Sequence, residues 1–192
     1  MIRRTHFADP AHATQAVFRV AMQAFSRPGQ LQRLEVALDS FGQWDPGTIA
    51  LLLTLCDFET NVLLEPNNGE LASLLKLHTG TQIVNDRSAA DFVAVTRPRP
   101  EFGFEDLRIG TDETPHLAAT LLLQVKSFHD GTPVKLSGPG IKEPITLLVN
   151  GLSSRFFEGR NSFRFPTGVD VFLIADQQLV GLPRTTRAEV KY

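Results

Sequence analysis

Cysteine is almost absent from this chain, and this scarcity limits what the protein can be. A single cysteine, Cys56, among 192 residues excludes an internal disulfide and a zinc site built from cysteines. The chain alone also cannot hold an iron–sulfur cluster, because such clusters are bound by several thiolates. Cys56 follows the largely apolar residues 51–55, so we expect a small buried residue rather than a reactive thiol.

Long apolar runs and an excess of basic charge are also lacking. No segment approaches the roughly 18 to 20 apolar residues that span a bilayer, so we expect no contact with a membrane. The N-terminus carries two arginines without an apolar stretch behind them, which indicates no signal peptide and a cytoplasmic protein. The formal net charge of −2 argues against a nucleic-acid partner. The length favours one domain over residues 1–192.

Histidine and lysine form no recognisable catalytic arrangement. None of the five histidines has the spacing of a metal-binding pair on a helix, so we expect no metal site. The five lysines include no obvious candidate for a Schiff base. A phosphate-binding loop and a nucleophile elbow are missing as well. The chemistry of the protein must therefore be sought in weaker signals.

Helix signals are strongest in the first half of the chain. Asp9-Pro10 and Asp45-Pro46 each place a capping aspartate before a proline at the first helical position. Apolar residues that recur three and four apart after residue 10 indicate one face of an amphipathic helix. We expect helices from residue 10 to the Pro28-Gly29 pair, and over residues 46–56, 70–78 and 153–163.

Strand signals occur between and after these helices. We expect strands at residues 31–38, 61–64, 82–84, 91–96, 117–125, 133–137, 145–149, 169–175 and 179–182, and a loop over residues 97–116. The pair Asp130-Gly131 predicts a turn that makes residues 133–137 the hairpin partner of residues 117–125. The apolar runs at 119–125 and 169–175 indicate strands buried on both faces. Periodicity alone does not separate a buried strand from a buried helix in the first run, and we favour the strand. Together the elements predict an α/β or α+β fold, in which helices cover a mixed sheet.

Three loops carry glycines or arginines that could bind a ligand. Gly138 and Gly140 follow a predicted strand, where bare backbone could cradle an anion or simply form a tight turn. Arg27 could clamp a phosphate or carboxylate, or be an ordinary surface residue of a turn. Arg184 and Thr185 suit the recognition of phosphate or of an acidic surface, but they could equally belong to a solvated edge strand.

Two carboxylates, Asp57 and Glu59, end the second predicted helix, and Thr60 follows them. Two carboxylates two residues apart could provide a general base or ligands for magnesium if the chain is extended there. The alternative is a solvated helix end. Carboxylates are unfavourable near a helix C-terminus, which slightly favours a functional use.

Phenylalanine is abundant, and one group of it surrounds the last predicted helix. Phe156, Phe157, Phe163 and Phe165 belong either to the core or to a subunit interface. Aromatic and arginine side chains are common anchors at protein interfaces. We therefore predict an interface role for Phe156, Phe157 and Arg160.

Several short motifs in a fixed order cover most of the chain. They are Phe18-Arg19 with residues 24–29, Leu53 with residues 56–60, Gly80-Thr81, Pro115 with residues 119–121, and then residues 136–141, 160–170 and 182–187. The last three read Leu-Ser-Gly-Pro-Gly-Ile, Arg-Asn-x-Phe-x-Phe-Pro-x-Gly-x-Asp and Leu-Pro-Arg-Thr-Thr-Arg. In this order they resemble the PhnH family, the H subunit of the carbon–phosphorus lyase system that degrades phosphonates.

The resemblance implies a fold, partners and a role. The fold is expected to be similar to the large domain of pyridoxal-phosphate-dependent transferases without the cofactor site, so no cofactor is expected. The family implies a homodimer that assembles with the G, I and J subunits. In that pathway the G, H, I and L proteins couple a phosphonate to the ribose of ATP and release adenine, and the J protein later breaks the carbon–phosphorus bond. The H subunit is not expected to catalyse either step alone.

Three hypotheses follow for the function of the chain. The first is an accessory, non-catalytic subunit of the phosphonate system, with or without a pocket for a nucleotide or phosphonate. The second is an autonomous small-molecule enzyme or binding protein that uses Arg27, Asp57, Glu59 and Arg184. The third, a pyridoxal-phosphate enzyme, rests on fold analogy alone.

Overall fold

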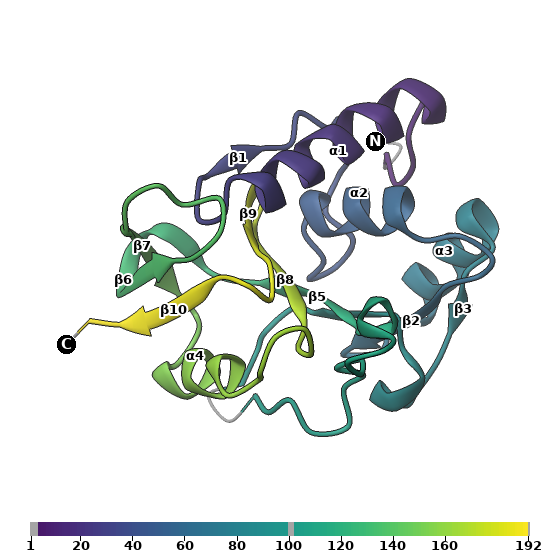
Figure 1. Cartoon of the computed structure of the whole chain (residues 1–192). Coiled ribbons are helices and arrows are strands. Elements are labelled where there is room, and N and C mark those ends of the chain that lie inside the picture. Colours follow the sequence, from purple (N-terminus) through teal and green to yellow (C-terminus); the bar gives the residue numbers. More distant parts are fainter. Residues whose placement is uncertain (1–3, 100–101, 192) are drawn as a thin grey trace.

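The computed structural model describes residues 4–99 and 102–191, and two sheets organise them (Figure 1). The large sheet has seven strands in the order β1-β9-β8-β5-β4-β2-β3. Its strands are β1 (Gln32–Arg33), β2 (Asn61–Glu65), β3 (Gln82–Ile83), β4 (Phe92–Val95), β5 (Thr120–Gln124), β8 (Asp170–Ala175) and β9 (Gln178–Leu182). The small sheet has three antiparallel strands in the order β10-β6-β7, with β6 at Ser127–Ser137, β7 at Ile145–Asn150 and β10 at Arg187–Val190.

The inner strands of the large sheet run in one direction. β3, β2, β4, β5 and β8 are parallel neighbours, whereas β9 is antiparallel to β8 and β1 is antiparallel to β9. The carboxyl ends of the parallel strands therefore meet at one edge of the sheet, called here the carboxyl edge. Their amino ends meet at the opposite edge, called the amino edge.

Four helices lie around these sheets, at Pro10–Ser26 (α1), Pro46–Leu55 (α2), Gly69–Thr79 (α3) and Ser154–Asn161 (α4). All four predicted helices are confirmed within one or two residues at most ends. Asp9 caps α1, since its Oδ1 accepts a hydrogen bond from the His12 amide at 3.3 Å. Asp45 instead accepts a hydrogen bond from the amide of Asp176 at 3.0 Å, which ties the start of α2 to the end of β8.

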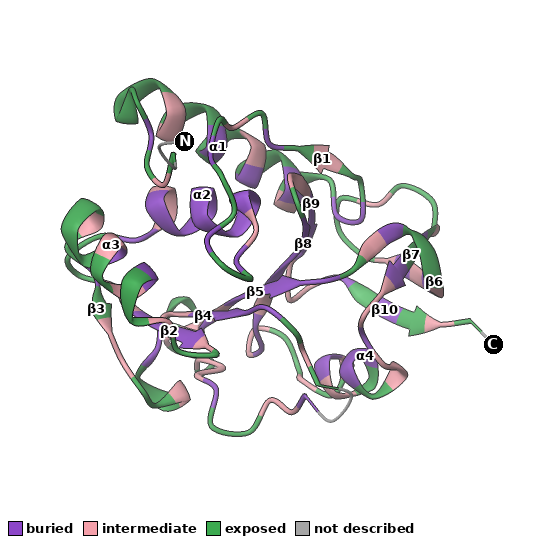
Figure 2. Ribbon diagram, turned by 180° about the vertical axis from the view of Figure 1, so that it is seen from behind, coloured by how far each residue is buried: buried purple, intermediate pink, exposed green. Residues whose placement is uncertain are grey.

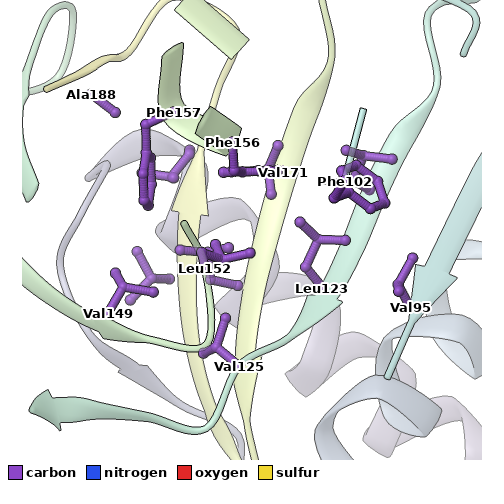
Figure 3. Close-up of a cluster of buried hydrophobic side chains, with 14 of the residues drawn as sticks. Val95, Phe102, Leu123, Val125, Val149, Leu152, Phe156, Phe157, Val171 and Ala188 are labelled. Atoms are coloured by element: carbon purple, nitrogen blue, oxygen red, sulfur yellow. The ribbon is translucent and has the colours of Figure 1, made fainter. Parts of the chain in front are cut away.

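The large sheet is buried on both faces, as its apolar strands predict. Successive residues of β5 alternate between two cores: Leu121 and Leu123 face one, and Leu122 faces the other. Side chains of α1, α2 and α3 complete the second core. The small sheet and α4 complete the first, where Figure 3 shows Phe156 and Phe157 of α4 with Val149 of β7. Figure 2 shows the buried residues concentrated along the central strands.

The fold class is confirmed as α/β with a mixed sheet, but helices alone do not cover it. One face carries helices and the other carries α4 together with the small sheet. The likeness to pyridoxal-phosphate-dependent transferases stays a prediction. No helix in the described ranges has the length and apolar content needed to cross a membrane.

Two strand predictions need correction. The expected strand at residues 31–38 is shorter in the structure, where only Gln32 and Arg33 form β1 and pair with β9. The chain beyond Arg33 is no longer part of the sheet, and Leu34 and Leu38 are buried in the core. Residues 133–137 are not the hairpin partner of β5, which lies between β4 and β8 with parallel pairing to both. They belong to β6, which pairs with β7 and β10 in the small sheet.

The physical reason why β5 and β6 belong to different sheets lies in the side chains of these two strands. β5 is apolar at nearly every position and therefore needs cover on both faces, whereas β6 buries Val134 and Leu136 between more exposed residues. Asp130 and Gly131 lie inside β6, where the register with β7 shifts, and not in a hairpin turn. Cys56 is buried as expected, and this burial raises the pKa of its thiol.

Candidate functional site

The turns that carry five of the predicted ligand-binding residues, Arg27, Gly138, Gly140, Arg184 and Thr185, meet in one place. A Cβ on Gly140 would lie 2.8 Å from Cδ of Pro28, in the turn that contains Arg27. A Cβ on Gly138 would lie 2.7 Å from the carbonyl oxygen of Thr185. The φ angles of Gly138 and Gly140 are also positive, at 127° and 84° respectively. The glycines are therefore required by the close packing of three backbone segments, which favours the tight-turn interpretation. Anion contact there stays a prediction.

Arg184 lies at the amino edge and is bound on several sides by the protein itself. Its Nη2 lies 2.6 Å from Oδ2 of Asp170, and its Nη1 donates to the carbonyl of Pro115 at 2.6 Å. Its backbone amide donates to the same aspartate at 2.7 Å. The pair is mostly buried, with 15% and 23% of the two side chains exposed. Arg184 thus joins the start of β8 to two loops, and its donors are engaged within the protein.

Arg160 of α4 is buried near this pair, which corrects the interface prediction. Only 4% of Arg160 is exposed, and its guanidinium donates to the carbonyls of Leu182, Pro183 and Thr186. Burial lowers the pKa of Arg160 to about 10, while the charge of Asp170 opposes that change. Arg160 therefore holds the segment between β9 and β10 in place by hydrogen bonds from the protein interior.

The two phenylalanines predicted at the same interface are core residues as well. Phe156 and Phe157 are each 1% exposed. Their rings lie 5.2 Å apart, edge to face. Phe165, by contrast, is 65% exposed. The prediction that Phe156 and Phe157 anchor a partner is therefore wrong, and the core alternative holds for both.

Asp57, Glu59 and Thr60 form the turn that follows α2. Oδ1 of Asp57 accepts a hydrogen bond from the Glu59 amide at 2.9 Å. The Thr60 hydroxyl donates to the Asp57 carbonyl at 2.8 Å and lies 3.2 Å from the hydroxyl of Thr81, just before β3. β3 and β9 lie toward opposite ends of the large sheet (Figure 1). The structure thus separates this turn from Gly138 and Thr185, and its proposed chemistry stays a prediction.

A pocket at the carboxyl edge was missed by the sequence analysis. Its volume is about 830 Å³, and it opens between the ends of β2 and β4. Its walls come from the ends of these strands and from two loops beside them. The lining residues are Gln43, Glu65, Pro66, Arg87, Val95, Thr96, Arg97, Arg99, Phe102, Gly103 and Glu105.

The topology explains why a pocket forms there. After β2 the chain passes through α3 to β3, the outermost strand on one side of the sheet. After β4 it passes to β5, which lies on the opposite side of β4 from β2. Connections that diverge from neighbouring parallel strands leave a crevice outside their carboxyl ends, the usual place for a ligand in open α/β sheets. We call this cavity the switch-point pocket.

One wall of the switch-point pocket is fixed by a paired charge. Arg87 contacts both carboxylate oxygens of Glu65, with Nε and Nη2 each 2.7 Å from an oxygen. Its guanidinium carbon lies 4.9 Å from the ring centre of Phe102, and its Nη1 donates to the Gly103 carbonyl at 3.3 Å. The hydrogen bonds to Glu65 raise the pKa of Arg87. This wall therefore carries its own counter-charge.

Another wall is anchored to β5. Gln124 at the end of that strand is buried and donates to the carbonyl of Gln43 at 2.9 Å. The Gln124 side-chain oxygen accepts a hydrogen bond from the Asp45 amide at 3.0 Å. The loop before α2 is thereby held beside the pocket. Within the described ranges no group of three or more His, Cys, Asp or Glu side chains could hold a metal ion.

A sequence signal for this pocket existed. Arg97 and Arg99 lie just beyond Thr96, which follows the buried strand β4, and the carboxyl ends of parallel strands meet at one edge. The prolines between and after them were interpreted only as a break in secondary structure. The pairing of β4 with β2 and β5, which gives the arginines their place, could not be inferred from the local sequence.

Comparison with known proteins gives concordant results. Residues 5–189 match the family described as PhnH, a bacterial phosphonate metabolism protein. The chain is 34% identical over 187 residues to the Alpha-D-ribose 1-methylphosphonate 5-triphosphate synthase subunit PhnH of Rhizobium meliloti (strain 1021), covering 95% of this chain and 94% of that protein. It is 30% identical over 179 residues to HtxG of Stutzerimonas stutzeri, which is provisionally named a C-P lyase subunit protein, covering 92% and 86%.

Proposed function

Since the chain belongs to the PhnH family of bacterial phosphonate metabolism proteins, we propose that it is an accessory subunit of a carbon–phosphorus lyase system. In this role it supports the coupling of an alkylphosphonate to the ribose of ATP, with release of adenine. The observation that carries the proposal is the 34% identity to a named synthase subunit over 94% of that protein's length. Because ATP is the co-substrate, the proposed site of action is the cytoplasm.

Partners are central to this proposal, and we propose a homodimer together with the G, I and J subunits. Both relatives are named as subunits, which supports assembly with other chains in general. The buried centre of a protein interface is more apolar than the rest of the surface and is enriched in aromatic residues and methionine. Several large apolar side chains are exposed in the described ranges, and they differ in how they are arranged.

We propose the outer side of α1 as a contact surface. Phe18 and Met22 lie one helical turn apart and are 50% and 54% exposed. Leu31, just before β1, is 45% exposed. Leu31 precedes β1, which lies beside and contacts α1 (Figure 1). We call these three residues the α1 patch.

We also propose that the chain works without pyridoxal phosphate. That cofactor is held by a lysine that forms a Schiff base inside its pocket. All five lysines fall in the described ranges, and none of them lines the switch-point pocket. A cofactor absorbance band that persists after gel filtration of the protein incubated with pyridoxal phosphate would contradict this proposal.

Co-expression with the G, I and J subunits of the same source tests the subunit role. We expect one stoichiometric complex, whose mass gives the copy number of this chain. Recovery of this chain alone, with its partners expressed and soluble, would overturn the proposal.

Two double variants then locate the contact. Phe18→Asp with Met22→Asp should lose the chain from the complex, because it places charges within a buried apolar contact. The matched control, Phe58→Asp with Leu77→Asp, changes two side chains that are 72% and 80% exposed elsewhere and should remain in the complex. Retention of the first variant would show that the α1 patch is not the contact.

A further inference from the structure

The switch-point pocket contains a polar group that the fold leaves unused. Thr96, directly after β4, is only 5% exposed, and its Oγ1 has no hydrogen-bond partner in the described part of the chain. A buried hydroxyl without a partner costs about 1 to 3 kcal/mol, and buried polar groups in proteins usually have partners. Thr96 lines the pocket, and its hydroxyl oxygen has less than 1 Å² of exposed surface, so a small rotation of the side chain would bring the hydroxyl to a bound molecule as its missing partner.

Two arginines beside this hydroxyl are also without partners. Arg97 and Arg99 are exposed in the pocket lining, and neither side chain makes a hydrogen bond or an ion pair with another described residue. Arg87, in the same pocket, is fully engaged with Glu65. The pocket therefore offers two free guanidinium groups and a paired one against two lining carboxylates, Glu65 and Glu105, so its lining carries a net positive charge.

The size and the donor set define the class of ligand. A volume of about 830 Å³ falls within the range of roughly 300 to 1,000 Å³ that is typical of small-molecule sites. Two forked guanidinium groups and a hydroxyl offer more donors than one carboxylate can use, whereas phosphate and phosphonate groups each present three outer oxygens. Phe102 and Val95 add apolar surface for the organic part of a ligand.

We infer that the switch-point pocket binds a small organic molecule through its phosphate or phosphonate group, with Arg97 and Arg99 as cationic receptors and the Thr96 hydroxyl as a hydrogen-bond donor. The choice of ATP and methylphosphonate as candidate molecules rests on the proposed function. The location of the site and the anionic class of its ligand are inferred from the pocket itself. The Arg87–Glu65 pair keeps the wall in place and leaves the two other arginines for the ligand.

Isothermal titration calorimetry of the full chain with ATP and, separately, with methylphosphonate tests this inference. We expect saturable binding of at least one of the two, and the one that binds identifies the source of the anionic group. Arg97→Ala with Arg99→Ala should weaken that binding about tenfold or more, because it removes two charge-assisted contacts. Circular dichroism confirms that the variant is folded.

A second double variant provides the matched control. Arg19→Ala with Arg164→Ala removes the same amount of charge from two exposed positions outside the pocket and should leave the affinity unchanged. Equal weakening by both variants would mean that net charge and not the pocket attracts the anion, which would overturn the inference. So would a folded chain that binds neither compound.

The co-expression experiment separates this inference from the proposed function. A chain that joins the complex but binds neither compound would retain the subunit role and lose the ligand site. A chain that binds one of them through Arg97 and Arg99 but never joins a complex would retain the site and lose the subunit role.

Discussion

The two edges of the large sheet use the same residue types for different purposes. At the amino edge, Arg184 is paired with Asp170, and the buried Arg160 donates to backbone carbonyls. At the carboxyl edge, Arg97 and Arg99 have no partner among the described residues, and the hydroxyl of Thr96 is buried without one. At the amino edge most of the arginine donors are thus engaged within the protein, although Nε of Arg160 and Oγ1 of Thr186 are buried without a hydrogen-bond partner in the described ranges. At the carboxyl edge the guanidinium groups of Arg97 and Arg99 are open to solvent and available to a ligand or a partner.

This difference shows that the type of residue does not reveal its role. An arginine that the fold has already bound contributes to stability, and an arginine beside a cavity without partners is available for function. Arg160 and Arg184 were predicted from sequence to contact a partner or a ligand, and both hold the chain around β9 and β10. The following substitutions test whether the two edges differ in this way.

The largest effect is expected for Arg160→Met at the amino edge. This change leaves the carbonyls of Leu182, Pro183 and Thr186 without their buried donor, so the free energy of unfolding should fall by about 3 kcal/mol. Urea denaturation followed by circular dichroism measures the change. Arg155→Ala, at an exposed position of the same helix, should alter it by no more than about 0.5 kcal/mol. Similar values for the two variants would contradict the internal role of Arg160.

A smaller loss is expected for Arg184→Ala. The change leaves the mostly buried Asp170 carboxylate without its cationic partner, and we expect a loss of about 2 kcal/mol. Arg27→Ala, in an exposed turn, should change the unfolding free energy by less than about 0.5 kcal/mol. If Arg184→Ala proved as mild as Arg27→Ala, Arg184 would be free for a ligand after all.

The smallest effect, with the opposite sign, is expected for Thr96→Val at the carboxyl edge. Removing an unpartnered buried hydroxyl should raise the unfolding free energy of the ligand-free chain by about 1 kcal/mol. Thr81→Val is the matched control, because the buried Thr81 hydroxyl donates to the Thr60 carbonyl at 2.7 Å. That change should lower the unfolding free energy by about 1 kcal/mol. Destabilisation by both variants would mean that Thr96 is satisfied within the fold.

Local signals predicted the elements of the fold well and their pairing less well. The aspartate–proline pairs at residues 9–10 and 45–46 marked two helix starts, and the apolar run of β5 marked a strand buried on both faces. The assignment of β6 as a partner of β5 failed, because strand pairing depends on which faces are covered by elements distant in sequence. The turn predicted at Asp130-Gly131 was wrong, because these residues lie inside β6 where its register with β7 shifts.

The candidate site was harder to predict than the fold for the same reason. Gly138, Gly140 and Thr185 were predicted as candidates on two separate loops, and the structure brings these loops together through backbone packing. Arg97 and Arg99 were passed over, because nothing near them in sequence shows that β2 and β4 are neighbours whose connections diverge. A pocket formed at the meeting of two distant strands leaves little trace in either segment alone.

An NMR titration of the isotopically labelled chain with ATP or methylphosphonate tests the contrast between the edges most directly. The account predicts that the backbone amides of residues 95–97, Arg99, Glu65 and Gly103 shift in a saturable way, while those around Asp170 and Arg184 stay in place. Saturable shifts confined to the amino edge, or no shifts with either compound, would contradict it.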